Sequence, residues 1–372
     1  MRYLILCCLL ALLLTASTTA QPHDHAARHI DFPDIPGYQT LVTDLHIHTV
    51  FSDGSVWPNI RVQEALRDGL DAIAITDHLE YQPHKEDIPH PDRNRSHAIA
   101  VEARNQNDLL VIRGSEITRR MPPGHANAIF LEDANPLLQD DSVAVFQEAK
   151  RQGAFVFWNH PMWTAQTPDG KASLTDLHRR LIREGLLHGI EVVNELSYSD
   201  EALQIALDHD LTIIGTSDIH GLIDWQYDVP HGGHRPVTLV FATERSEAGL
   251  KEALMDGQTA VWFDEILIGK EEWVRPLLNA AITIASASYQ GDTSVLNVVL
   301  ENHSEASFIL HNESPYTFHA HADLLTLAPH TTTQLQVKTG ARLAQIDLDF
   351  EVLNAVVAPN THPAITLSAT VQ

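Results

Sequence analysis

The chain has 372 residues, of which 24 are Lys or Arg and 49 are Asp or Glu, giving a formal net charge of −25 at pH 7. A surface with this charge repels polyanions, which argues against nucleic acids and anionic membranes as partners. The length exceeds that of most single compact units, so two domains are expected.

The first 20 residues predict export. Arg2 precedes an almost unbroken apolar run from Leu4 to Leu14, and small residues then lead to Ala20. This order is typical of a cleaved secretory signal peptide, and the run is shorter than the roughly 18 residues that a membrane span needs. The expected destination is the periplasm or the extracellular medium.

The exported chain would lack disulfides, although disulfides are common in exported proteins. Cys7 and Cys8 both lie within the signal segment, so the exported chain would have no thiol and no disulfide. Its stability would then depend on core burial and on bound metal. Residues 21–38 are rich in His and Pro and are expected to form a flexible leader.

Residues 39–275 alternate short apolar runs with amphipathic stretches, a pattern typical of βα units around a parallel sheet. The expected strands are Leu41–His48, Asp71–Thr76, Leu109–Gly114, Ala126–Leu131, Ala154–Trp158, Gly189–Val193 and Leu211–Gly215. The expected helices include Ile60–Arg67, Ser142–Arg151, Leu174–Arg183 and Glu201–Leu207. A run Pro236–Ala242, a helix Ser246–Leu254 and a strand Thr259–Phe263 would complete the unit. We therefore expect an α/β fold, a distorted seven-stranded (β/α)7 barrel.

The character of the sequence changes after Arg275. Residues 276–372 contain alternating apolar and polar runs separated by Asn, Ser, Thr and Gly, with few helix signals. This pattern predicts a small antiparallel β-sandwich as an accessory domain.

Metal-capable side chains stand at the ends of most expected barrel strands. In chain order they are His46, His48, Asp53, Asp77, His78, Glu116, His125, His160, Asp218 and His220. Residues i and i+2 of a strand point to the same side, so His46 and His48 should converge. In a parallel barrel the C-terminal ends of the strands meet on one face, where these groups would gather.

The residue types at this face indicate a chemistry. Imidazole and carboxylate without thiolate suit Zn, Mn or Fe, and ions a few Å apart can clamp a phosphoryl group. Any one of these side chains could instead be a helix cap or a loop residue. The His319 and His321 pair has the same spacing but no acidic neighbours after strands, so it is expected to be solvated. Repetition in one direction along the chain favours the metal interpretation of the first set.

The motifs themselves resemble those of a known family. Asp44-Leu45-His46-Ile47-His48-Thr49, Phe51-Ser52-Asp53-Gly54 and Thr76-Asp77-His78 resemble the polymerase and histidinol phosphatase (PHP) family. Gly114-Ser115-Glu116, Gly124-His125, Asn159-His160-Pro161 and Ser217-Asp218-Ile219-His220 fit its later motifs in order. The resemblance covers about residues 41–263 and implies a barrel of PHP type. The signal segment, the β-rich tail and residues 234–242 further resemble exported PHP phosphodiesterases that act on small alkyl phosphodiesters.

The resemblance implies a role for each donor. One ion would be held by His46, His48, Glu116 and Asp218, a second by Glu116, His125 and His160, and a third by Asp53, His78 and His220. Many family members have His where this chain has Asp53, which leaves the third site and the metal identity open. The expected cofactors are two or three divalent ions per chain.

The mechanistic hypothesis is in-line attack on phosphorus by a hydroxide that bridges two of the ions. Arg235 is the candidate for contacting the nonbridging oxygens, ahead of Arg113, Arg119 and Arg120, since Arg fits phosphate in a bidentate manner. Asp77 is a candidate orienting residue or proton donor, and Asp44 is expected to support the first ligands from behind. Trp158, Trp163, Trp225 and Tyr198 are candidates to line a pocket.

Three functions compete at this point. A phosphodiesterase acting on small diesters is favoured because the candidate loops contain few Lys or Arg. A phosphomonoesterase of histidinol-phosphatase type is the second reading, and a secreted metal-binding protein, suggested by the 23 His, is the third. The partner would be a small-molecule phosphoester, and the sequence does not determine the oligomeric state.

Overall fold

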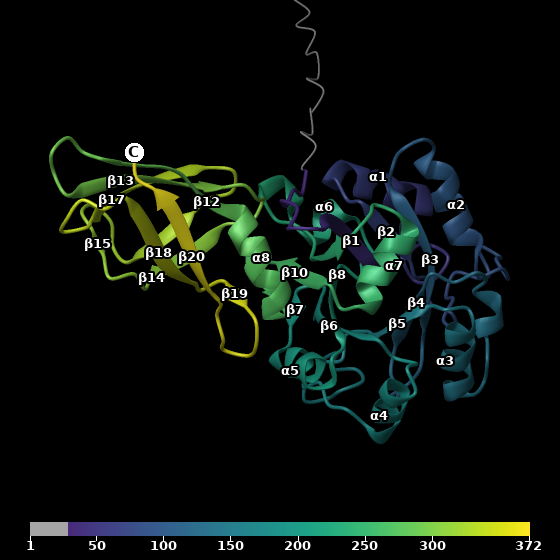
Figure 1. Ribbon diagram of the computed structural model, residues 1–372. Helices are drawn as coiled ribbons and strands as arrows, with labels where there is room; N and C mark the ends of the chain where they lie inside the picture. The colour runs from purple at the N-terminus through teal and green to yellow at the C-terminus, as the bar shows by residue number, and fades with distance from the viewer. Residues whose placement is uncertain (1–28) are drawn as a thin grey trace, which may run out of the picture.

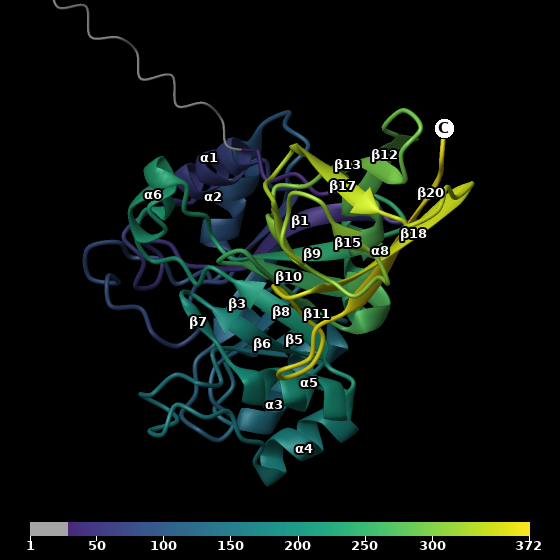
Figure 2. The same ribbon diagram turned by 90° about the vertical axis from the view of Figure 1, so that its left-hand side faces the viewer.

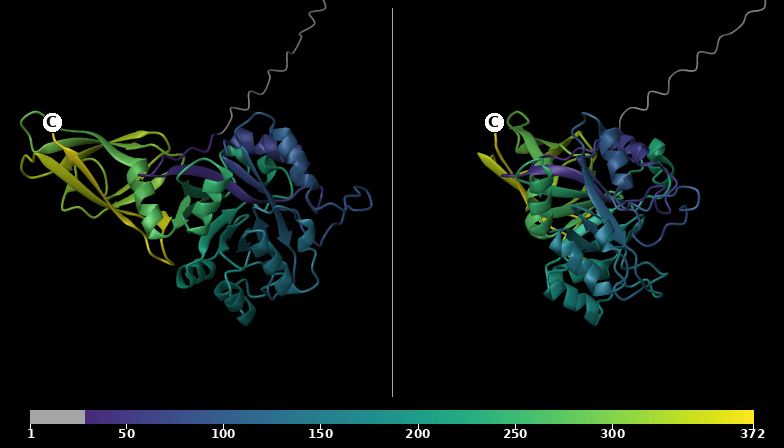
Figure 3. Two further views of the ribbon diagram at one scale, coloured as in Figure 1. Left: turned by 45° about the vertical axis from the view of Figure 1, so that its right-hand side comes forward. Right: turned by 90° about the vertical axis from the view of Figure 1, so that its right-hand side faces the viewer.

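A computed structural model describes residues 29–372 (Figure 1). The proposed signal segment and the first part of the leader lie outside the described residues. A large curled sheet with surrounding helices occupies residues 39–281, and β-strands dominate the remainder. The β-rich part projects to one side of the helical part (Figure 3). No helix among the described residues is long and apolar enough to cross a membrane.

The large sheet contains all the strands expected for the first domain. Its order is β19-β11-β10-β9-β1-β2-β3-β4-β5-β6-β7, and β8 pairs with β6. The bounds are β1 Gln39–Ile47, β2 Ala72–Ile75, β3 Leu110–Ile117, β4 Ala126–Ile129, β5 Phe155–Trp158, β6 Gly189–Asn194, β7 Ser197–Tyr198, β8 Thr212–Thr216, β9 Val237–Ala242, β10 Thr259–Phe263, β11 Ile266–Gly269 and β19 Ala355–Val356. Most of these strands are buried on both faces, which explains their near-continuous apolar runs.

The sheet is mixed in direction, where the sequence predicts a parallel one. β1, β2 and β3 pair in parallel, as do β6 and its partners β5 and β8. β4 runs antiparallel to both β3 and β5, and β9 runs antiparallel to β1 and β10. Apolar runs buried on both faces carry no directional signal, so strand direction was not readable from composition.

Threonine side chains connect β8 to β9 and β10, where the sheet curls back on itself. Thr238 Oγ1 donates to the Gly215 carbonyl at 2.8 Å and accepts from the Gly215 N–H at 3.0 Å. Thr259 Oγ1 donates to the Ile213 carbonyl at 2.8 Å. A Cβ at Gly215 would lie 2.2 Å from Val261, so glycine permits the close approach of these strands. β8 therefore lies against β9 and β10 (Figure 2).

Helices cover the outside of this sheet. Their bounds are α1 Pro58–Asp68, α2 Arg95–Arg104, α3 Ser142–Arg151, α4 Asp176–Arg183, α5 Asp200–His209, α6 Ile223–Gln226, α7 Glu247–Met255 and α8 Glu271–Ala281, with 3₁₀ turns at Asn135–Leu137 and Val229–His231. Side-chain caps fix several starts: Asp141 accepts from the Val143 and Ala144 N–H groups at α3, and Ser199 caps α5. α1 ends at Gly69, whose φ of 74° is the left-handed C-cap geometry.

The segment before β1 does not form the flexible leader that the sequence predicts for it. From residue 29 onward it packs onto the barrel: Ile30, Phe32 and Ile35 are buried, and the Phe32 ring meets Trp262 edge-on at 5.3 Å. The Glu305 N–H donates to the Asp31 carbonyl, which links this segment to the C-terminal part. The prediction is wrong for residues 29–38, because burial of Ile30, Phe32 and Ile35 stabilises an ordered segment despite the surrounding Pro and Asp.

The C-terminal part is a sandwich of two antiparallel sheets, β12-β13-β17-β15 and β16-β14-β18-β20. Its strands are β12 Ile282–Tyr289, β13 Val295–Asn302, β14 Phe308–Asn312, β15 Thr317–Phe318, β16 Leu324–Leu327, β17 Thr332–Lys338, β18 Gln345–Val352 and β20 Ala364–Thr370. Along β13 and β18 burial alternates with period two, as expected for strands with one face on a core. His319 and His321 are exposed, as the sequence predicts.

The two parts share structure across the expected boundary at residues 275 and 276. Helix α8 spans that boundary, and β12 follows it directly. The short strand β19, from the C-terminal part, pairs in parallel with β11 at the edge of the large sheet. Asn354 donates from its amide to the Glu265 and Ser307 carbonyls, which fixes this junction.

Candidate metal centre

One end of the barrel gathers every metal-capable side chain that the sequence singles out as a ligand. His46 and His48 lie at the end of β1, and Asp218 and His220 follow β8. His125 immediately precedes β4, and because β4 is antiparallel to its neighbours, its start lies beside the ends of β3 and β5. The strand that runs against the expected direction therefore delivers its ligand to the same face.

The first group of donors lies around Asp218. Its Oδ1 is 3.1 Å from His46 Nε2 and 3.0 Å from His48 Nε2. The two imidazole nitrogens are themselves 3.0 Å apart. Donor atoms this close to one another could share one divalent ion.

Glu116 lies between all the groups. Its Oε1 is 3.0 Å from His125 Nδ1, 3.4 Å from His160 Nε2 and 3.7 Å from His46 Nε2. Its Oε2 is 2.5 Å from His78 Nδ1 and 3.6 Å from His48 Nε2. A fully buried carboxylate that faces ligands on both sides has the position of a bridging ligand between ions.

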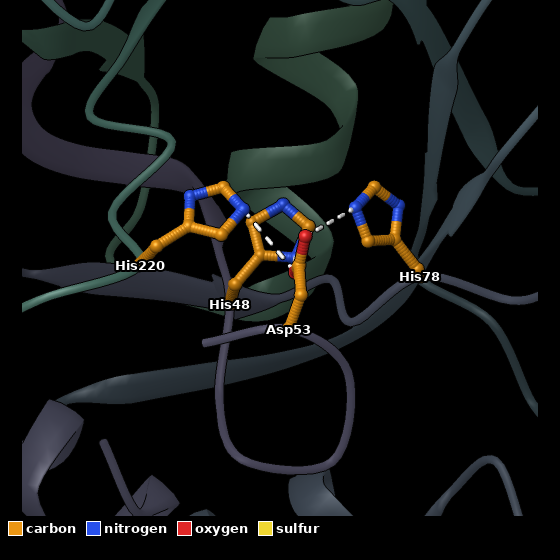
Figure 4. A group of neighbouring side chains, drawn as sticks. All are labelled: His48, Asp53, His78 and His220. Atoms are coloured by element: carbon orange, nitrogen blue, oxygen red, sulfur yellow. Dashed lines mark ion pairs between the residues drawn. The ribbon is translucent and has the colours of Figure 1, made fainter. Parts of the chain in front are cut away.

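The remaining donors form a more open group around Asp53 (Figure 4). Asp53 Oδ1 is 3.2 Å from His220 Nε2, and its Oδ2 is 3.3 Å from His78 Nε2. His48 Nδ1 is 3.6 Å from Asp53 Oδ1, so its ring stands between this group and the first. Asp53, His78 and His220 are thus close enough to one another to hold one ion together.

The electrostatic field of the cluster favours binding of a cation. Burial opposes a charge on His78, but Glu116 and Asp53 raise the pKa of its imidazole to about 10. Burial likewise opposes a charge on His46, whose pKa Asp218 and Glu191 raise well above the ordinary value. Burial favours neutral Glu116, yet the imidazoles of His78, His125 and His160 hold its pKa well below the ordinary value. A field that attracts protons to imidazoles also attracts divalent ions, which compete for the same nitrogens.

Three carboxylate oxygens provide a second test of fit. Asp53 Oδ1, Glu116 Oε2 and Asp218 Oδ1 are buried and accept no hydrogen bond from any described residue. The nitrogens that face these oxygens belong to imidazoles that are themselves candidate ligands, and coordination of an ion is a common way to satisfy such buried carboxylates. The nitrogen and oxygen donor set, with no sulfur, fits Zn, Mn or Fe.

Backbone geometry at the cluster is unusual. His160, Glu195 and Asp218 have φ values of 30°, 51° and 46°, in the left-handed region that non-glycine residues seldom adopt. Each follows the end of a strand, where the positive φ turns the chain sharply. Such conformations cost stability and persist where the surrounding structure imposes them, often at functional sites.

Glu191 orients the cluster, and the sequence analysis missed it. It lies inside β6 and is fully buried. Its Oε1 is 2.8 Å from His46 Nδ1 and accepts from Thr216 Oγ1, while its Oε2 accepts from the His160 N–H and the Asn194 amide. A carboxylate on the far nitrogen of a ligand His fixes the ring and its tautomer. The only available signal was an acidic residue inside an otherwise apolar strand.

Arg61 has a similar supporting role on α1. Its buried guanidinium donates to the His48, Ile219 and His220 carbonyls. It therefore joins the segment after β1 to the segment after β8, which carry ligands of two groups. Its place on the buried face of a helix gave no indication of this contact.

Asp77 acts on the backbone of the ligand loop. Its carboxylate accepts from the Thr49 N–H at 2.7 Å, from Thr49 Oγ1 and from Ser52 Oγ at 2.7 Å. These bonds hold the turn that presents Asp53, consistent with the expected orienting role. Both oxygens already serve as acceptors inside the loop, so the alternative role as proton donor to a leaving group is not supported.

The expectation for Arg235 is wrong. Its guanidinium is buried away from the pocket, with Nε and Nη2 donating to Asp68 Oδ2 at 2.9 and 2.6 Å and Nη1 donating to Asp44 Oδ2 at 3.1 Å. Burial would lower the pKa of Arg235, but Asp68 and Asp44 raise it further above its ordinary range. Asp44 also accepts from Ser217, so it supports the segment before Asp218 from behind, as expected. Two carboxylates compete for this Arg, and their positions were not visible in the sequence.

None of the weaker Arg candidates lines the pocket, and two of them are engaged elsewhere. Arg119 pairs with Glu80 at 2.9 Å and donates to the Gln139 carbonyl. Arg113 donates to the Glu132 carbonyl and to His97. Neither they nor Arg120 line the pocket above the cluster.

The cluster opens into a cavity of about 160 Å³. Its lining residues are Asp53, His78, Glu116, His125, His160, Trp163, Asn194, Glu195, Asp218 and His220. Of the four aromatic candidates only Trp163 lines it. Trp158 is buried against the His178 ring, Tyr198 donates to Asp200, and Trp225 is 81% exposed.

Comparisons with known proteins agree with this geometry. A family model described as the PHP domain matches residues 44–153, and one described as an Ig-like domain matches residues 282–368. The crystal structure of a two-domain protein from Bacteroides vulgatus ATCC 8482, containing a predicted PHP-like metal-dependent phosphoesterase, is 44% identical. That match covers 92% of this chain and 98% of the other, with a TM-score of 0.85.

Two other similar proteins are more distant or shorter matches. An uncharacterised protein of Methanocaldococcus jannaschii is 40% identical over 82 residues, which are 22% of this chain and 34% of that protein. This chain thus matches only about a third of that relative. The crystal structure of PsfC from Pseudomonas syringae PB-5123 is 18% identical, covers 60% of this chain and 92% of the other, and has a TM-score of 0.42.

Proposed function

Because this chain belongs to the PHP family, we propose that it is a metal-dependent phosphoesterase whose substrates are small organic phosphodiesters. Nine side chains would hold the divalent ions: His46, His48, Asp53, His78, Glu116, His125, His160, Asp218 and His220. The ions, when bound, would polarise phosphoryl oxygens and lower the pKa of water.

The charge of the cavity lining carries the choice of diester over monoester. Among the described residues no Lys or Arg lines the cavity, whereas Asp53, Glu116, Glu195 and Asp218 do. A phosphodiester carries one negative charge and an alkyl phosphomonoester approaches two at neutral pH. Bound ions would neutralise Asp53, Glu116 and Asp218, but Glu195 would still face the substrate with no Lys or Arg in the lining to offset it. A second charge on the substrate would meet this carboxylate, which favours the diester.

The protein side chains have separate tasks in this proposal. Glu116 fixes the distance between the donor groups, because its two oxygens face different histidines. Glu191 fixes the His46 ring and the His160 backbone, and Asp77 fixes the turn before Asp53. These contacts preorganise the site before substrate binds, which reduces the reorganisation needed during reaction.

A comparison of two chromogenic esters tests the proposal. The metal-loaded protein is expected to hydrolyse ethyl 4-nitrophenyl phosphate with a kcat/KM at least about tenfold above that for 4-nitrophenyl phosphate, since about 1.4 kcal/mol of charge repulsion suffices for that ratio. Chelator-treated protein serves as the control and should hydrolyse neither ester.

Two outcomes would contradict it. Faster hydrolysis of the monoester would indicate a phosphomonoesterase of histidinol-phosphatase type. Stoichiometric metal without turnover of either ester would favour the metal-binding function.

We also propose that the chain is exported, on the basis of its N-terminal residue pattern. Mass spectrometry of protein from the native host is expected to find a mature N-terminus at Gln21. An intact Met1 in the cell-associated protein would contradict export by cleavage.

A further inference from the structure

Three residues of the cavity wall are not among the nine donors: Trp163, Asn194 and Glu195. Asn194 is already used, because its amide donates to Glu191 Oε2 at 2.9 Å and to Asp218 Oδ2 at 3.2 Å. The parts of the wall that remain free to meet an organic group are therefore the indole of Trp163 and the carboxylate of Glu195.

Glu195 is held in place but its carboxylate is uncommitted. Its backbone N–H donates to the Thr216 carbonyl at 3.2 Å, and its positive φ turns it at the end of β6. The side chain is exposed, and within the described residues its carboxylate receives no hydrogen bond and forms no ion pair. A fixed backbone with a free carboxylate at a cavity wall is suited to contacting a ligand.

Trp163 contributes an apolar face beside the donors. Its ring centroid is 5.6 Å from that of His125 and 5.3 Å from that of His160, and the side chain remains 46% exposed. Its backbone N–H donates to the His160 carbonyl at 2.8 Å, which ties the indole to a ligand residue. Nearly half of the side-chain surface therefore remains free to contact a ligand.

We propose that Glu195 and Trp163 bind a cationic group on one ester arm of the substrate. An aromatic face together with a carboxylate is the combination that recognises ammonium and quaternary ammonium groups. The absence of Lys and Arg from the cavity lining in the described chain agrees with a ligand that brings its own positive charge. This inference rests on the proposed diesterase function and names its substrate class: zwitterionic phosphodiesters with an amino-alcohol arm.

Two esters of matched shape provide the test. 4-Nitrophenyl phosphocholine carries a quaternary ammonium, and 4-nitrophenyl 3,3-dimethylbutyl phosphate replaces that nitrogen with carbon. The wild-type protein is expected to favour the cationic ester by about tenfold in kcat/KM, the range of a cation–π contact reinforced by one carboxylate. Glu195→Gln should reduce this ratio to about twofold, and Trp163→Leu should reduce it as well.

A nearby carboxylate provides the matched control. Glu201 lies on α5, outside the cavity, and Glu201→Gln removes one negative charge without touching the wall. This variant should keep the tenfold ratio. Metal content is measured for every variant, so that a loss of ions is not mistaken for a loss of selectivity.

The possible failures can be told apart. Equal kcat/KM values for the two esters in the wild-type protein would overturn the cation site while leaving the diesterase intact. A Glu195→Gln variant that loses both esters to the same extent would also overturn it, since the residue would then act on the reaction rather than on the ammonium. Hydrolysis of neither diester, with hydrolysis of 4-nitrophenyl phosphate, would refute the proposed function itself.

Discussion

Glu116→Gln is expected to lower kcat/KM for a phosphodiester by about 1,000-fold or more and to reduce the number of divalent ions bound per chain. The carboxylate faces five imidazoles from a fully buried position, so the amide would remove a charge that several donor groups share. Stabilisation of transition-state charge by metal is worth several kcal/mol, which corresponds to this loss in rate. Elemental analysis and steady-state kinetics on the same preparation measure both effects.

Glu191→Gln provides a graded comparison. Glu191 contacts His46 and the His160 backbone rather than an ion. Replacement of such an outer partner usually lowers metal affinity or activity by about 10- to 100-fold. Glu184→Gln, at an exposed pair with Arg180, is the matched surface control. Full metal content and full activity in Glu116→Gln would show that the carboxylate does not join the ions.

Arg235→Met is expected to lower the free energy of unfolding by about 3–5 kcal/mol, because it leaves two buried carboxylates without their cation. Arg235 is 2% exposed, and its guanidinium makes three hydrogen bonds to Asp68 and Asp44. Arg67→Met removes a partly exposed pair with Asp224, for which about 0–1 kcal/mol is expected. Denaturant titration of the metal-free proteins compares the two.

A double variant separates burial from catalysis. In Arg235→Met with Asp68→Asn one uncompensated charge is gone, so part of the lost stability should return. An Arg235→Met variant as stable as the parent but inactive would instead restore the role of Arg235 as a phosphate contact and overturn its assignment to the protein interior.

Local sequence patterns anticipated the parts of this molecule that are locally determined. The apolar runs of β1, β5 and β10 have lengths that fit strands, and the bounds of β10 and α3 match the structure. The i, i+2 spacing of His46 and His48 follows from strand geometry alone. The clustering of donors was predictable because most of them stand at or just beyond the end or start of a strand.

Features that depend on distant contacts were not predictable in the same way. The direction of β4 is set by how its backbone pairs with β3 and β5, and its amino-acid composition would be the same in either direction. Arg235 lies close to His234 and a strand in sequence, but its fate depends on Asp68, which is 167 residues away. Glu191 resembled a polar interruption of β6, and three of its four contacts, with His46, His160 and Thr216, come from separate parts of the chain.

The strand β19 has a consequence for how the molecule can be divided. It supplies the outermost backbone partner of β11, and β11 in turn pairs with β10, which contacts β8 through the Thr259 hydrogen bond to the Ile213 carbonyl. A hydrolase trimmed near residue 275 would end within α8 and would leave a row of amide and carbonyl groups open to pairing with another molecule. The C-terminal part thus covers one edge of the large sheet. Replacing it with another domain would expose that edge, which favours self-association.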